Sequence, residues 1–97
     1  MKVRVARIYV TEGKHVHDKV FRILHDEHKV MGVTLFRGIS GFGRSGETHA
    51  AGLLDISFDL PVVIEFFDTE DNVQQALNAI ADLIPAGNVL LFDAENQ

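Results

Sequence analysis

The sequence predicts an α+β fold in which a four-stranded antiparallel sheet carries two helices on one face. Three observations predict it. The 97 residues suffice for one domain, apolar residues follow a strand period in some segments and a helix period in two others, and these segments alternate as β-α-β, twice over. This order is typical of the ferredoxin-like βαββαβ arrangement. We expect a single domain over residues 1–97.

The first β-α-β unit fills the amino-terminal third of the chain. Residues 3–10 are rich in β-branched side chains, as strands are. A helix is predicted from about His17 to His28, because apolar residues recur there at helical spacings: Val16, Val20, Ile23, Leu24 and Met31. Residues 33–37 predict a second strand, and the glycine-rich segment 38–52 predicts a loop.

The second unit begins with an alternating strand pattern, carried by Leu54, Ile56 and Phe58. Residues 60–67 continue that strand. Thr69 is a good helix cap, and the helix after it has one apolar stripe, made of Val73, Ala76, Leu77, Ile80 and Ile84. That helix is expected to end at Pro85, and residues 89–92 form a last short strand before the polar tail 93–97.

The apolar side chains outnumber what two short helices can cover. They include Phe36, Phe58, Phe66 and Phe67 together with several Val and Ile. We therefore expect the second face of the sheet to be buried against other copies of the chain, in a dimer or a trimer.

Charge is divided unevenly along the chain, whose formal net charge is −5. Residues 1–44 hold all nine Lys and Arg against four acids, and residues 45–97 hold ten acids and no base. No basic stripe runs through the chain, which argues against nucleic acid as a partner. A small anion is still a suitable ligand for the basic half, and attraction between the two halves explains the division equally well.

Other classes of protein are excluded by what the sequence lacks. The absence of cysteine excludes disulfide scaffolds, thiolate zinc sites and cysteine nucleophiles. The apolar runs are far shorter than the ~20 residues of a spanning helix, and the first residues do not resemble a secretory signal. We expect a cytoplasmic protein without membrane insertion.

The most unusual local sequence is residues 38–46, which hold four glycines and end near Arg44. Glycine lets backbone N–H groups approach an anion, and a guanidinium beside them adds a charge-assisted bond. The spacing of residues 41–46 matches G-x-G-x-x-G, but the dinucleotide fingerprint requires a helix after it, and a strand-rich segment follows here. Both a hairpin loop and a phosphate cradle fit this composition.

Five histidines raise the possibility of a metal site. His25 and His28 lie one turn apart on the predicted helix and suit zinc or copper, although a solvated helix face explains them too. His15 and His17 stand near the start of that helix, and His49 stands in the glycine-rich loop. No serine has a nucleophile elbow, so no catalytic residue and no enzymatic activity are predicted.

Two longer motifs carry a resemblance. Residues 32–43 follow the pattern Gly-x-Thr-x-x-Arg-Gly-Ile-x-Gly-Phe-Gly, and residues 59–65 read Asp-Leu-Pro-Val-Val-Ile-Glu, with Asp68 as the acid that follows. With Ile8-Tyr9 and the loop histidine His49, these residues resemble the PII superfamily of nucleotide-sensing regulators, and more closely its branch known as domain of unknown function 190.

The resemblance implies a homotrimer whose three clefts bind an adenine nucleotide and whose loop, residues 40–52, engages a transporter or an enzyme. By motif, Thr34 would face the adenine, Gly41 and Gly43 would offer backbone N–H groups, and Arg44 would contact the phosphates. The remaining residues of the branch pattern complete the expected nucleotide site: Arg37, Gly38, Phe42 and His49.

Departures from the PII pattern indicate a ligand of low charge. The spacing from Thr34 to Gly41 is one residue longer, Asn88 stands where PII proteins have lysine, and the arginines after their last strand have no counterpart within residues 1–97. We therefore expect AMP, ADP or a cyclic form rather than a triphosphate. Tyr9 is the only tyrosine, so nucleotide attachment to a loop tyrosine is excluded.

Three functions are thus distinguished. The first is a regulator that binds a nucleotide or anion, for which no other cofactor is expected. The alternative is a trimeric divalent-metal-binding or tolerance protein of the same fold, using His25 and His28. The third is a structural trimer with no ligand.

Overall fold

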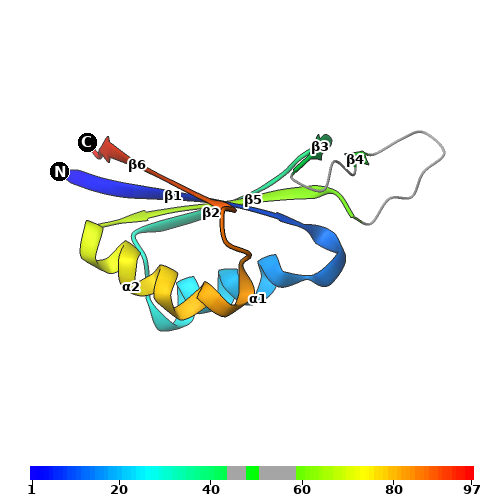
Figure 1. Cartoon of the computed structure of the whole chain (residues 1–97). Helices are drawn as coiled ribbons and strands as arrows, with labels where there is room; N and C mark the ends of the chain where they lie inside the picture. Colours follow the sequence, from blue (N-terminus) through cyan, green and yellow to red (C-terminus); the bar gives the residue numbers. More distant parts are fainter. Residues whose placement is uncertain (44–47, 51–58) are drawn as a thin grey trace.

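The computed structural model describes residues 1–43, the backbone of 48–50, and residues 59–97. The main sheet is antiparallel with the order β2-β5-β1-β6, where the strands are β1 (Lys2–Thr11), β2 (Gly32–Arg37), β5 (Pro61–Asp68) and β6 (Val89–Glu95). Helices α1 (Val16–Arg22) and α2 (Glu70–Ile80) lie on the same side of this sheet (Figure 1). The predicted fold class is confirmed.

The core forms between the sheet and the two helices. On β5, Val62, Ile64 and Phe66 are buried and alternate with less buried residues, as the two-residue period of a strand requires. The register places Ala6 of β1 opposite Phe66 and Ile8 opposite Ile64. The helices close this layer with Val20, Leu24, Val73, Ala76 and Ile80.

Each α-helix is followed by a turn that is not α-helical. α1 continues into a π-helical turn, η2 (Ile23–Glu27), after which His28 N donates to Ile23 O over 3.1 Å. Thr69 caps α2 as predicted, because its hydroxyl accepts a hydrogen bond from Asn72 N at 3.3 Å. α2 ends before the expected Pro85, because Ile80 leaves the α-helical region (φ −105°, ψ 5°) and a 3-10 turn, η3 (Ala81–Leu83), follows.

Two segments correct the sequence prediction. The segment 38–52, expected to be a loop, contains a short hairpin of β3 (Ser40–Phe42) and β4 (Thr48–Ala50), so His49 lies in a strand. β6 extends through Glu95 into the expected polar tail, because β1 begins at Lys2 and pairs with it there. The strand expected over 54–58 lies outside the described residues.

The second face of the main sheet is apolar and open. The strand register places Phe36, Leu90 and Phe92 on this face, where they are 50%, 53% and 40% exposed. The same face carries an ion pair of 3.3 Å between Arg7 Nε and Glu65 Oε1, and the Arg7 guanidinium lies 5.2 Å from the centre of the Phe92 ring. This surface has the composition of a protein interface.

The basic and acidic halves of the sequence contact one another along β1. Arg4 Nε donates to Asp93 Oδ1 over 2.7 Å, and Arg4 also lies 3.3 Å from Glu70 Oε1. The hydrogen bond to Asp93 raises the pKa of Arg4 above its ordinary value. Together with the pair of Arg7 and Glu65, these contacts show that the basic and acidic halves attract one another within one chain, which explains part of the uneven distribution of charge.

The junction of β5 and α2 is organised by one buried carboxylate. Asp68 is 4% exposed and accepts hydrogen bonds from Met31 N at 3.1 Å, Thr69 N at 2.7 Å and Asn72 Nδ2 at 3.0 Å. The carboxylate thereby joins the start of β2 to the start of α2. Within residues 1–43 and 59–97, no helix has the length and apolar character that crossing a membrane requires.

Candidate functional site

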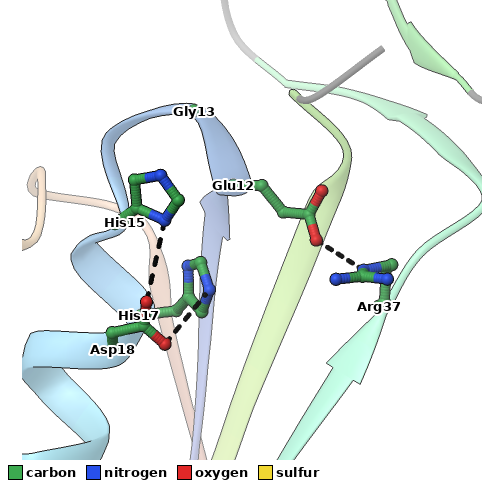
Figure 2. A pocket seen from close by; sticks show the side chains of 6 residues that line it. All are labelled: Glu12, Gly13, His15, His17, Asp18 and Arg37. Carbon is green, nitrogen blue, oxygen red and sulfur yellow. Dashed lines mark ion pairs between the residues drawn. The ribbon is translucent and has the colours of Figure 1, made fainter. Parts of the chain in front are cut away.

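The end of the sheet opposite Asp68 brings together three segments that are distant in sequence. The turn η1 (Glu12–Lys14) follows β1, the β2–β3 connection begins at Gly38, and Pro61 begins β5. Glu12 N donates to Leu60 O over 2.8 Å, and Gly38 N donates to Pro61 O over 2.7 Å. A hollow of about 470 Å³ opens here, lined by Glu12, Gly13, His15, His17, Asp18 and Arg37 (Figure 2).

Arg37 is the predicted site residue that lines this hollow. Its side chain is 70% exposed and forms an ion pair with Glu12, whose side chain is only 14% exposed. Figure 2 shows the two side chains reaching toward each other from the ends of β2 and β1. A guanidinium held by a single carboxylate and open to water on its other sides has donors left for a second anion.

The predicted glycines have different roles. A Cβ at Gly38 would lie 2.7 Å from Pro61 Cγ, so close packing on Pro61 explains why this position is glycine. A Cβ at Gly41 would lie 3.4 Å from the same atom, so the space for a side chain there is limited. A Cβ at Gly43 would meet no atom within 4 Å. Of these three glycines, Gly43 therefore has the most open space where a side chain would stand.

Thr34 and Arg37 lie on opposite faces of β2. Thr34 faces Glu65 in the register, on the open face of the sheet, whereas Arg37 faces Val62, whose side chain is in the core. Phe42 is 78% exposed on β3. One copy of the chain thus does not bring the expected adenine contact and Arg37 to the same surface.

The other expected contacts are only partly described. Gly41 and His49 are partners in the β3–β4 register, so the hairpin brings their backbones together. The side chain of His49 and the whole of Arg44 lie outside the described residues. Asn88, which precedes β6, is bonded to β1, because its Nδ2 donates to Tyr9 O over 2.7 Å and its carbonyl accepts from Tyr9 N over 2.9 Å.

The sequence prediction missed most of the hollow. His15 and His17 were noted only as histidines near a helix start, and Glu12, Gly13 and Asp18 were not considered. The signal that indicates them is the short pattern His15-x-His17-Asp18 after a turn. In the described part of the chain this is the one group of three or more potential metal ligands, and neither His25 nor His28 belongs to it.

Comparison with solved structures identifies the class of fold. CPII from Thiomonas intermedia K12, described as a nitrogen regulatory PII-like protein bound to ADP, AMP and bicarbonate, has a TM-score of 0.70 at 21% identity, over 100% of this chain and 97% of that one. CutA1 from Oryza sativa has a TM-score of 0.69 at 11% identity, over 100% and 84%. The fold is that of PII-like proteins.

Comparison of sequences identifies the family. The model of DUF190, described as an uncharacterized ACR, matches residues 1–96, and the chain belongs to this family. A UPF0166 protein from Methanocaldococcus jannaschii is 27% identical over 97 residues, which are 95% of this chain and 88% of that protein. Another from Aquifex aeolicus is 31% identical over 84 residues, 82% and 80% of the two chains. The resemblance in the two long motifs is confirmed.

Proposed function

We propose that this chain is a PII-like binding regulator, without catalytic activity, that takes an adenine nucleotide or similar small anion in clefts between copies of itself. It signals to a transporter or enzyme through residues 40–52. The observation that carries the proposal is the exposed guanidinium of Arg37, paired with Glu12 at the hollow where the β2–β3 connection begins.

The chemistry of this end of the sheet suits an anion. An arginine donates to phosphate or carboxylate through two parallel N–H groups, and such bonds are stronger than neutral ones. The open space beside Gly43, where a side chain would stand, adds a place for close approach. An incoming anion would bind the remaining donors of Arg37 and compete with Glu12 for the charge of the guanidinium.

Two observations support a ligand shared between copies of the chain. A single molecule that contacted both Thr34 and Arg37 could not do so on one copy, because they lie on opposite faces of β2. The open face that holds Thr34 is also apolar and exposed. We propose that this face is buried in a homotrimer and that the clefts between subunits hold the ligand.

The charge of the chain favours a ligand with few phosphates. Residues 45–97 contain no base, and the amide of Asn88 is already bonded to Tyr9. AMP, ADP or a cyclic mononucleotide therefore fits better than ATP. The PII-like protein CPII is described with ADP, AMP and bicarbonate, which supports the same class of ligand here.

The proposal is tested by calorimetric titration of the full chain with AMP, ADP, ATP, cyclic AMP and bicarbonate. A ligand at about 100 times its Kd also stabilises the fold by about 2.7 kcal/mol, which thermal unfolding measures independently. We expect Arg37→Ala and Arg44→Ala each to weaken binding more than tenfold. Light scattering gives the mass of the assembly, with three copies expected.

Arg22→Ala is the control, because it removes another exposed cation, on α1, and should leave binding unchanged. Equal affinities in all three variants and the parent chain would contradict the anion site. ATP binding more tightly than AMP and ADP would contradict the argument from charge.

A further inference from the structure

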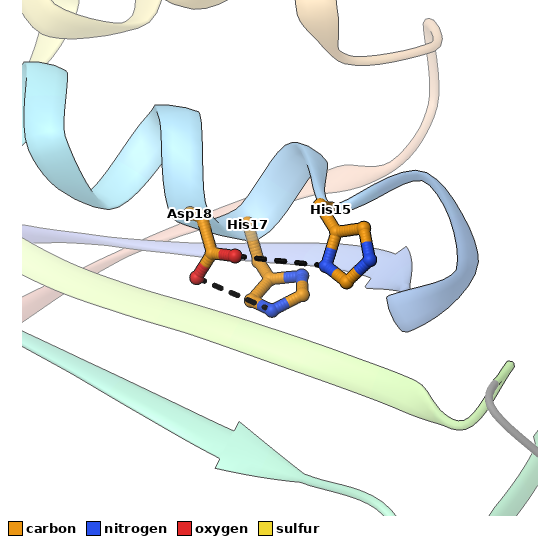
Figure 3. A group of neighbouring side chains, drawn as sticks. All are labelled: His15, His17 and Asp18. Atoms are coloured by element: carbon orange, nitrogen blue, oxygen red, sulfur yellow. Dashed lines mark ion pairs between the residues drawn. The ribbon is translucent and has the colours of Figure 1, made fainter.

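The hollow also holds a compact group of metal-ligating side chains, which we call the HxHD cluster: His15, His17 and Asp18. Their potential ligand atoms all lie within 4.8 Å of one another. His15 Nδ1 is 3.7 Å from Asp18 Oδ2, and His17 Nε2 is 3.5 Å from Asp18 Oδ1. Figure 3 shows one oxygen of the Asp18 carboxylate directed toward each imidazole.

The backbone holds the cluster in place before any ligand binds. His15 N donates to Glu12 O over 2.9 Å, and Asp18 N donates to His15 O over 3.2 Å, so two consecutive turns position His15 and Asp18. His15 has left-handed backbone angles (φ 53°, ψ 26°), which are uncommon for a residue other than glycine. Backbone conformations of this kind concentrate at functional sites.

The spacing between the side chains suits an ion better than direct hydrogen bonds. Hydrogen bonds from N–H to oxygen span roughly 2.7–3.2 Å, and both His–Asp separations exceed this range. A tetrahedral metal with bonds of about 2.0–2.2 Å separates its ligand atoms by roughly 3.3–3.6 Å. The His17 separation of 3.5 Å lies within that range and the His15 separation of 3.7 Å lies just above it, each measured to a different oxygen of Asp18.

His17 adds an independent observation. Its side chain is only 13% exposed, and its Nδ1 is buried without a hydrogen-bond partner among the described residues. Buried polar atoms are nearly always paired, and an unpaired one calls for an explanation such as a bound ion or water. Because Nε2 is the ring nitrogen that faces Asp18, the unpaired Nδ1 shows that the second nitrogen of His17 has bonding capacity that the described protein groups do not use.

We propose that the HxHD cluster binds a divalent transition-metal ion of the zinc class. Two imidazoles and one carboxylate are ligands that such ions prefer, whereas Mg²⁺ and Ca²⁺ take oxygen ligands. Three protein ligands leave a further coordination position, which water or an anion in the hollow would fill. The inference rests on these three residues and is independent of the proposed nucleotide site.

The chain contains its own matched control. His25 also stands beside an acid, with Nδ1 2.7 Å from Asp26 Oδ1, but that pair is hydrogen-bonded, and the His25 ring stacks on Phe21 at 6.4 Å between centroids. His15 and His25 are both exposed, so replacing either one removes one imidazole without opening the core.

The test is a competition titration of the full chain with Zn²⁺ against a chromophoric chelator, repeated with Co²⁺ and its visible absorption. We expect one ion per chain. His15→Gly should weaken binding at least tenfold without lowering the thermal midpoint of the metal-free protein, because glycine adopts the left-handed conformation freely. Asp18→Asn should weaken binding to a similar degree, and His25→Gln should not.

Other results would overturn the proposal. The first is that the parent chain binds Zn²⁺ no more tightly than His15→Gly does. The second is that His25→Gln loses as much Zn²⁺ affinity as His15→Gly, which would indicate binding by scattered surface histidines. Loss of nucleotide binding in Arg37→Ala with Zn²⁺ binding intact would separate this site from the anion site. The absence of any nucleotide binding would leave the metal result unaffected.

Discussion

The carboxylates of Asp68, near one end of β5, and of Glu12 and Asp18, near the other, have different partners. Beside α2, the buried carboxylate of Asp68 is fully engaged by three donors of its own chain. At the other end, around Pro61, Glu12 faces an exposed arginine and Asp18 faces two histidines at distances too long for hydrogen bonds. One end is complete without a ligand, and the other has polar groups left for one. The contrast separates residues that hold the fold from residues available for function.

Asp68→Ala tests the complete end and should have the largest effect. The change removes the charged acceptor of three donors, of which two are backbone N–H groups. We therefore expect the free energy of unfolding to fall by about 2–4 kcal/mol. Urea unfolding at one fixed protein concentration measures it, because an oligomer's stability depends on concentration.

Asp71→Ala is the comparison for this change, since Asp71 is exposed in the first turn of α2. Its loss should cost about 0.5 kcal/mol. A cost below about 1 kcal/mol for Asp68→Ala would mean that water or relaxation replaces the bonds of the carboxylate.

Gly38→Ala tests whether the glycines at the open end serve packing or binding. The added Cβ would lie 2.7 Å from Pro61 Cγ and 3.3 Å from Pro61 O, and we expect a loss of about 1–3 kcal/mol by urea unfolding. Gly43→Ala is the matched variant and should change stability little, because its Cβ meets nothing within 4 Å. Equal losses in the two variants would contradict the role of Pro61, because a Cβ at Gly43 makes no such contact.

The sequence predicted the scaffold well because each element has a strong local signal. Val62, Ile64 and Phe66 alternate as a half-buried strand, and Thr69 caps α2 through Asn72 as its residue type suggested. Asp68 was recognised only as part of a motif, because its three donors come together through tertiary structure. The composition of residues 38–46 indicated a hairpin loop but not the pairing of β3 with β4, because glycine-rich segments carry little strand signal.

The site was predicted less completely. Arg37 was identified by family pattern, but its partner Glu12 lies 25 positions earlier in the chain. Helical spacing made His25 and His28 the candidate metal ligands of the alternative function, whereas the fold groups His15 and His17 with Asp18. That grouping depends on the turn after β1 and the left-handed backbone of His15, and no periodic pattern reports either one.

Glu12→Gln should have the smallest effect on stability and the most specific effect on function. The change keeps the size of the side chain, and because the partner Arg37 is exposed, the loss of the ion pair should cost about 1 kcal/mol. Because Glu12 competes with an anion for Arg37, its neutralisation should tighten anion binding up to about fivefold, the equivalent of about 1 kcal/mol. Isothermal titration with AMP or ADP measures this change.

Asp93→Asn is the control for this variant, because it removes a carboxylate partner of Arg4, in an ion pair that does not line the hollow. If only Glu12→Gln tightens binding, Arg37 is the group that the anion contacts. Tighter binding in both variants would mean that lower net negative charge alone attracts the ligand. Weaker binding in Glu12→Gln would instead show that Glu12 orients Arg37, so this end of the sheet would be as fully organised by its own contacts as the Asp68 end.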